Sequence, residues 1–161
     1  MSKKDDKWGE LINLQTEEVK HWLNEMDKLL LEGGCKAAVD AKGNFTYTSK
    51  KSGKIICRIT MAEGVCTVRP NTNTANCSSV IAAKPTDSML DVMRSSPRGC
   101  GSCALKNPNF VSCKHGGPYR FAHDGEQFES CRYNGYDFTT EDAANRECIK
   151  QWVVRELGSP L

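Results

Sequence analysis

The sequence has no apolar run of the roughly 18 residues that a membrane helix needs. No apolar segment follows the opening Met-Ser-Lys-Lys-Asp-Asp-Lys, so no secretion signal is visible. The chain also lacks a glycine-rich phosphate loop after a strand, a Gly-x-Ser-x-Gly elbow and a His-Glu-x-x-His helix. Internal repeats and low-complexity tracts are absent. We therefore expect a cytoplasmic protein with no membrane partner and no recognisable catalytic set.

Net charge is also small, at +2, but it is unevenly distributed. Residues 1–34 carry 5 basic and 8 acidic side chains, residues 35–120 carry 13 and 4, and residues 121–161 carry 4 and 8. A basic middle between acidic ends indicates either a surface for an anionic partner or acidic terminal helices lying across a basic sheet. The second explanation is favoured, because nucleic-acid-binding domains are usually basic overall.

The chain has 161 residues, of which 39% are apolar and 26% are charged, a composition typical of one soluble globular domain. We expect a single domain over residues 1–161. Within it, residues 1–14 are predicted to be a disordered N-terminal segment. Residues 98–135 are predicted to form a cysteine-rich knuckle and hairpin.

A helix is predicted to begin after Thr16, which can cap it, and to end at Gly33-Gly34. Between them apolar residues recur at helical spacing, and Trp22 and Met26 lie on the resulting apolar stripe. Such a stripe must cover something apolar, so we expect both side chains in the core.

The pattern then changes to short runs with a period of two residues, separated by turn formers such as Glu63-Gly64. Antiparallel strands joined by tight turns are the economical interpretation. Phe45 and Tyr47 share one face of their strand and are expected to lie under the first helix. The four predicted strands cover residues 37–39, 45–48, 54–61 and 65–69.

Beyond the meander, Thr86 can cap a short helix, whereas residues 71–84 receive no assignment. Asp124-Gly125 lies between two runs of mixed apolar and polar residues, and this dipeptide favours a two-residue hairpin turn. The sequence therefore predicts a hairpin of residues 119–123 and 126–130.

A last helix is predicted from Thr139 or Thr140 to Gly158, with Cys148 as a small core residue. The expected fold class is α+β. Its antiparallel sheet combines the four-stranded meander with the C-terminal hairpin, two long helices pack on one face, and a cysteine-rich loop precedes the hairpin.

Four of the nine cysteines follow the pattern C-x2-C-x9-C-x17-C. In a reducing compartment such cysteines are thiols or metal ligands rather than disulfides, and an odd total excludes complete pairing. Four thiolates can hold a structural zinc ion, and an iron–sulfur cluster uses the same ligands. His115 and His123 are reserve ligands that we expect at the surface. The predicted metal ligands are Cys100, Cys103, Cys113 and Cys131.

A redox function is an alternative, because Cys100 and Cys103 have the two-residue separation of dithiol oxidoreductases. In those proteins a helix N-terminus lowers the pKa of the first thiol. Here the motif follows a predicted helix and leads into a loop, so that activating feature is missing. The thiol–disulfide hypothesis therefore ranks below the metal site.

A third hypothesis makes the basic middle a nucleic-acid-binding surface. Exposed aromatic side chains on a sheet can stack on the bases of a single strand, and Phe45 and Tyr47 would serve if they were exposed. Packing under the first helix explains the two rings more simply. The basic residues of this hypothesis are Lys50, Lys51, Lys54 and Arg58.

The order of these features resembles small bacterial α+β proteins of unknown function with a cysteine-rich C-terminal hairpin. The resemblance implies one compact domain and supplies no activity. With no catalytic set visible, we expect a non-enzymatic binding module whose ligand, a small molecule or a protein, sits between helices and sheet. The residues that carry the resemblance are Trp22, Glu25-Met26, Cys100, Cys103, Cys113, Asp124-Gly125, Cys131 and Phe138.

Overall fold

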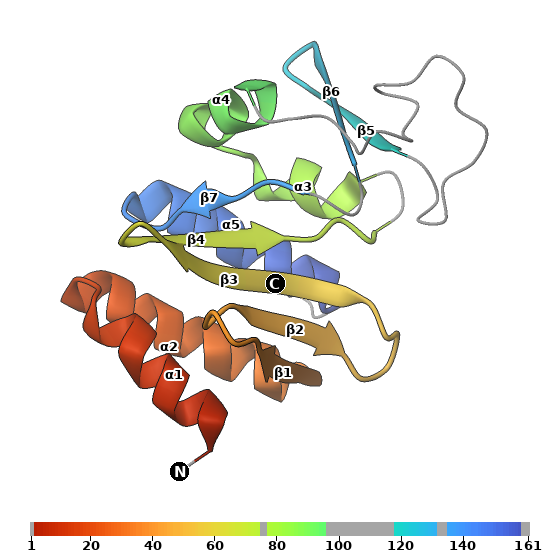
Figure 1. Ribbon diagram of the computed structural model, residues 1–161. Helices are drawn as coiled ribbons and strands as arrows, with labels where there is room; N and C mark the ends of the chain where they lie inside the picture. The colour runs from red at the N-terminus through yellow and green to blue at the C-terminus, as the bar shows by residue number, and fades with distance from the viewer. Residues whose placement is uncertain (1, 75–76, 96–117, 132–134, 159–161) are drawn as a thin grey trace.

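The computed structural model describes residues 2–74, 77–95, 118–131 and 135–158, and of residues 118, 119, 130 and 131 only the backbone. Within these residues the fold is α+β, with a five-stranded antiparallel sheet in the order β1-β2-β3-β4-β7 and a separate two-stranded sheet of β5 and β6 (Figure 1). The helices are α1 (Lys3–Asn13), α2 (Glu17–Glu32), α3 (Ser78–Ala83), α4 (Asp87–Ser95) and α5 (Ala143–Glu156). The strands are β1 (Cys35–Val39), β2 (Phe45–Ser49), β3 (Ile55–Ala62), β4 (Val65–Pro70), β5 (Pro118–His123), β6 (Glu126–Cys131) and β7 (Phe138–Thr139).

Helix α2 and the meander confirm the predictions. The Thr16 hydroxyl accepts from the backbone N–H of Val19 at 3.4 Å, which satisfies one of the free donors at the helix start. Trp22 and Met26 are buried, at 7% and 0% exposure. Strands β1 to β4 pair in sequence order, and Glu63 adopts the positive φ of 52° that a tight two-residue turn needs.

The prediction that residues 1–14 are disordered is wrong, because most of this segment forms α1. Ser2 and Asp5 make a reciprocal capping box. The Ser2 hydroxyl accepts from the Asp5 backbone N–H at 3.2 Å, and the Asp5 carboxylate accepts from the Ser2 backbone N–H at 3.2 Å. Two free donors are thereby satisfied at the helix start.

Burial of Trp8 holds α1 on the rest of the domain. Its ring meets Phe45 edge to face, with centroids 5.1 Å apart, and its Nε1 donates to the side-chain oxygen Oδ1 of Asn24 in α2 at 2.8 Å. Leu11 is buried on the same helix. Only Trp8, Leu11 and Ile12 are large and apolar in α1, and so few apolar residues give little periodic signal, which explains why the sequence pattern missed this helix.

The predicted hairpin is confirmed, but it does not join the main sheet. Strand β7 occupies the edge of β4, where Phe138 pairs with Val68. The hairpin lies instead beside α4 in Figure 1, and its Phe121 and Phe128 rings stack with centroids 5.2 Å apart. The meander is therefore extended by the two-residue strand β7 and not by the two strands of the hairpin.

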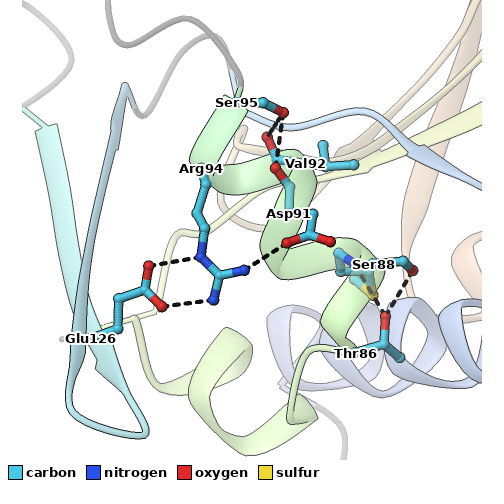
Figure 2. Close-up of polar contacts among 8 residues, drawn as sticks. Thr86, Ser88, Asp91, Val92, Arg94, Ser95 and Glu126 are labelled. Carbon is cyan, nitrogen blue, oxygen red and sulfur yellow. Dashed lines mark hydrogen bonds and ion pairs between the residues drawn. The ribbon is translucent and has the colours of Figure 1, made fainter.

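An ion pair attaches the hairpin to α4. Figure 2 shows the Arg94 guanidinium between two carboxylates, donating to both oxygens of Glu126 at 2.7 Å and to Asp91 at 2.7 Å. These bonds raise the pKa of Arg94 and lower that of Glu126, so both groups stay charged. The same helix begins with the predicted cap, since the Thr86 hydroxyl accepts from the Met89 N–H at 3.2 Å.

Residues 71–84, which had no assignment, contain α3. The Glu156 carboxylate of α5 fixes the approach to this helix, because it accepts from Ser79 Oγ, from Thr74 Oγ1 and from the backbone N–H of Asn73. Apolar periodicity did not reveal the helix because six residues make fewer than two turns.

The last helix begins later than predicted. Asp142 is its N-cap and accepts from the Ala144 N–H at 2.7 Å, whereas Thr139 belongs to β7. The predicted start at Thr139 or Thr140 would have placed Asp142, the actual cap residue, in the first turn. Cys148 is buried at 4% exposure, which confirms its predicted place in the core.

Large side chains fill the interior between the main sheet and its helices. Each has less than 2% exposure, so this interior is closely packed. These side chains include Trp152, Tyr47, Phe45, Phe138, Leu23, Met26, Leu30 and Ile59.

Candidate functional site

The main sheet has one buried face and one partly exposed polar face. Phe45 and Tyr47 of β2 pair with Ile59 and Cys57 of β3, and all four are 0% exposed. Since successive side chains alternate between faces, the residues between them lie on the opposite face. We call this opposite face the open face. Its polar members are Lys36, Thr46, Thr48, Arg58, Thr60, Thr67, Arg69 and Thr139, and its apolar members are Ala38, Ile55, Ala62 and Val65.

The open face is polar and accessible. In Figure 1 the broad side of β3 and β4 is turned to the viewer, and no helix of the described residues crosses it. Lys36 and Thr139 are exposed and the other polar members are half-buried. Thr60 and Thr67 lie opposite each other and share a hydrogen bond of 2.8 Å between their hydroxyls. The result is a flat surface of hydroxyls and cations.

Two arginines lie at the centre of the open face. Arg58 of β3 is directly opposite Arg69 of β4, and like charges in this position repel. Arg69 is held by Asp137, which accepts from its Nε at 2.9 Å and from its Nη2 at 2.8 Å. Gly135, at φ 56°, allows the close approach, since a Cβ there would lie 3.0 Å from Arg69 Cδ.

The turn between β2 and β3 extends the basic surface. Lys50, Lys51 and Lys54 are exposed there, and the Lys54 carbonyl accepts from the Ser49 N–H at 2.9 Å. Residues 35–70 hold seven basic and two acidic side chains, a net charge of +5.

The helix acids do not neutralise this charge. Within the described residues, neither Lys36 nor the three turn lysines has a carboxylate within 4.0 Å, whereas acids of α2 pair with Lys4, His21 and Lys28. Helices α1 and α2 carry acidic side chains, but within the described residues these make no ion pair with the meander lysines.

The aromatic residues of the nucleic-acid hypothesis are not available. Besides being 0% exposed, Tyr47 donates from its hydroxyl to the Asp27 carboxylate at 2.7 Å. Burial, followed by this bond, raises the pKa of Tyr47 far above its usual value, so the phenol stays neutral. Phe45 is covered by Trp8. The expectation that both rings belong to the core is confirmed, and base stacking on them is excluded.

Five cysteines have side chains that the structure describes, and all five are buried free thiols. Burial raises the pKa of Cys66 to about 11 and that of Cys148 to about 12. It also raises the pKa of Cys35 and, more strongly, that of Cys57. Because the thiolate is the reactive form, none of these four is poised for redox or metal chemistry at neutral pH. The fifth, Cys77, donates from Sγ to the Arg120 carbonyl at 3.5 Å.

Most of the predicted metal site lies outside the described residues, namely Cys100, Cys103 and Cys113, together with His115. Cys131 is the last residue of β6, and its backbone pairs with Pro118. The hairpin therefore brings the backbone of Cys131 beside residue 118. Within the described residues no group of three or more His, Cys, Asp or Glu side chains could hold a metal ion.

Sequence reasoning identified the basic residues of the site but missed its threonines. Thr60 of β3 and Thr67 of β4 lie opposite each other, and Thr46 and Thr48 of β2 lie on the same face, opposite Arg58 and Ile55. Their signal was present in the sequence, because each alternates with a buried apolar residue. The prediction used only the apolar residues of these strands, which mark the buried face.

Comparisons with known proteins add no family. No protein family, curated protein or solved structure gave a significant match to the chain. The resemblance to small bacterial α+β proteins therefore stays a prediction. In the part of the chain that the structure describes, no helix is long and apolar enough to cross a membrane.

Proposed function

We propose that this chain is a non-enzymatic binding module that binds the sugar-phosphate backbone of nucleic acids on the open face and the adjoining lysine turn. The observation that carries the proposal is the set of meander lysines without carboxylate partners among the described residues, next to rows of threonine hydroxyls. Lysine and arginine neutralise phosphates, and threonine hydroxyls donate hydrogen bonds to phosphate oxygens.

The proposed binding does not read the bases. Phe45 and Tyr47 are buried, so the described part of the open face offers no ring on which a base could stack. Affinity should therefore depend on charge density rather than sequence. Duplex DNA carries one negative charge per about 1.7 Å of helix axis, about twice the density of a single strand, so a duplex should bind at least as tightly.

Fluorescence anisotropy with short labelled duplexes tests this function. The triple variant Lys50→Gln, Lys51→Gln, Lys54→Gln should lose most of the affinity at low salt. The matched control is Lys3→Gln, Lys20→Gln, Lys28→Gln, which removes the same charge from α1 and α2 and should bind like the unmodified chain. Equal loss in both variants would show that only net charge matters and would contradict a site on the sheet.

A structural zinc ion held by Cys100, Cys103, Cys113 and Cys131 is the second part of the proposal. Two observations support it. The five described cysteines are separately buried, which leaves these four as candidate ligands. The Pro118–Cys131 pairing also returns the chain of Cys131 towards the end of the cysteine-rich segment. An iron–sulfur cluster and a cycling Cys100–Cys103 disulfide are the alternatives that metal analysis distinguishes.

The proposal also covers the arrangement of the two long helices and the cellular compartment of the protein. Helices α2 and α5 are proposed to cover the same face of the main sheet, within a single domain. Arg146 Nη2 lies 3.3 Å from Glu18 Oε2, and a Cβ on Gly33 would lie 2.8 Å from Leu157 Cδ1, so the helices are close at both ends. A cytoplasmic location is supported by the five described free thiols, because such thiols persist in reducing compartments.

A further inference from the structure

A second candidate site lies outside the open face, between the α3–α4 connection and the turn of the β5–β6 hairpin. It is an open pocket of about 680 Å³. It is lined on one side by Lys84 of the connection and Asp87, the first residue of α4. On the other side it is lined by His123 and Asp124 of the hairpin. A volume of this size is in the range of small-molecule sites. None of these residues belongs to the proposed nucleic-acid surface, so the pocket can be judged independently.

Charges of both signs line the pocket without neutralising each other. No carboxylate of the described residues lies within 4.0 Å of Lys84 Nζ, although Asp87 and Asp124 line the same pocket. The only one of these groups with an ion-pair contact is the Asp124 carboxylate, which lies 3.4 Å from His123 Nε2. Lys84 and Asp87 are exposed and remain hydrated.

The backbone fixes where these charges sit. Lys84 ends α3 in the left-handed region at φ 55°, and Asp124 opens the hairpin turn at φ 48°. The left-handed region is strained for Lys84, so the chain path there is held by its surroundings, whereas an Asp-Gly turn favours this region at Asp124. Pro85 between the two helices is buried. The pocket is thus built from restrained segments at α3 and at the hairpin turn.

An apolar patch accompanies the charges. Ile81 of α3 lines the pocket and is 43% exposed, one of few large apolar side chains with that much exposure in the described residues. Pro85 lines it beside Ile81. A ligand with an apolar group could cover this surface and remove it from water.

We propose that this pocket binds a small zwitterion with an apolar side chain, of the class of free aliphatic amino acids. Its carboxylate would pair with Lys84, its ammonium group with Asp87 and Asp124, and its side chain would cover Ile81. A simple anion would meet the two carboxylates, and a simple cation would meet Lys84. Only a ligand with both charges matches both sets of groups.

Three probes of nearly equal shape separate the possibilities. L-leucine carries both charges, isocaproate lacks the amino group, and isoamylamine lacks the carboxylate. Titration of the full-length protein would be followed by NMR through the His123 imidazole signal, assigned with the His123→Gln variant, and by calorimetry. Leucine should bind and shift this signal, and each single-charge analogue should bind at least about tenfold more weakly.

Variants test the assigned contacts. Lys84→Gln and Asp87→Asn should each weaken leucine binding by about tenfold or more, because each leaves one ligand charge unpaired. Lys42→Gln, an equally exposed lysine of the β1–β2 turn, is the matched control and should leave binding unchanged. Circular dichroism would verify that each variant is folded. Isocaproate or isoamylamine binding as tightly as leucine, no leucine binding, or equal losses with Lys42→Gln would each overturn the proposal.

Discussion

Arg58 and Arg69 lie directly opposite each other on β3 and β4, and Asp137 binds Arg69 through a two-point ion pair. Two opposed guanidinium groups repel each other, so the carboxylate stabilises the pair while it occupies one cation. For a surface that binds phosphates, Asp137 is a competitor of the ligand. Its removal is therefore informative.

The variant Asp137→Asn should bind nucleic acid more tightly than the unmodified chain. Arg69 would then be available to a phosphate, and the plot of log K against log salt for duplex DNA should steepen by about 0.9. Because the ion pair is partly exposed, stability should fall by only about 1 kcal/mol or less. Anisotropy titrations over a salt series and urea unfolding measure the two effects. Unchanged or weaker binding by the folded variant would place the ligand away from the open face.

Removing the Glu156 carboxylate should destabilise the domain. Ser79, Thr74 and Asn73 all donate to it, and an amide in its place loses the charge that strengthens these bonds. We expect Glu156→Gln to lower the free energy of unfolding by about 2 kcal/mol in urea titrations. Glu147 of the same helix is exposed and accepts from the Gln151 side chain, so Glu147→Gln is the control, with an expected change below about 0.5 kcal/mol. Equal effects would mean that Glu156 does not anchor the segment before α3.

Alkaline pH should destabilise the fold through its buried thiols. The folded pKa of Cys148 is raised to about 12 from an ordinary value of 9.0, mainly by burial. The neutral Cys148 thiol therefore contributes fully to the free energy of unfolding below pH 9. This contribution is lost as pH rises towards 12, by up to about 1.4 kcal/mol per pH unit. Urea unfolding in reductant at pH 8 and pH 10.5 would measure this loss, which should be smaller in Cys148→Ala. An equal loss in the variant would contradict the assignment.

Thiol counting tests the proposed zinc site. The chain has nine cysteines, five of them buried in the described residues, so denatured protein should release nine reactive thiols and native chelated protein four. With zinc bound, these four should also be protected, and metal analysis should find about one zinc per chain. Four freely reacting thiols in protein purified without chelator would reject the site. Visible absorbance with iron would favour a cluster, and a reducible Cys100–Cys103 disulfide would favour the redox alternative.

Strong local patterns explain how much of the fold could be predicted. Helix α2 has a continuous apolar stripe between Thr16 and Gly33, and the meander has turn residues between period-two runs, so both were predicted within a few residues. Strand β7 has only two residues, and nothing in so short a segment indicates that Phe138 pairs with Val68. Elements that depend on a distant partner leave little trace in local sequence.

The same reasoning applies to the candidate site. Lys50, Lys51 and Lys54 were recognisable as a charge cluster, because composition alone reveals them. That Arg69 is occupied by Asp137, 68 residues away, required the three-dimensional arrangement. The pocket beside Lys84 and Asp124 was not predicted either, since it joins two segments separated by some forty residues of sequence.

The salt dependence of duplex DNA binding tests the central claim most directly. If the three turn lysines contact phosphates, each contributes about 0.9 to the slope of log K against log salt, so the Lys50, Lys51, Lys54 triple variant should be less steep by about 2 to 3. The Lys3, Lys20, Lys28 variant should keep the slope of the unmodified chain. A lysine-turn variant with an unchanged slope, or no measurable binding by the unmodified chain at low salt, would contradict a nucleic-acid-binding function for the open face.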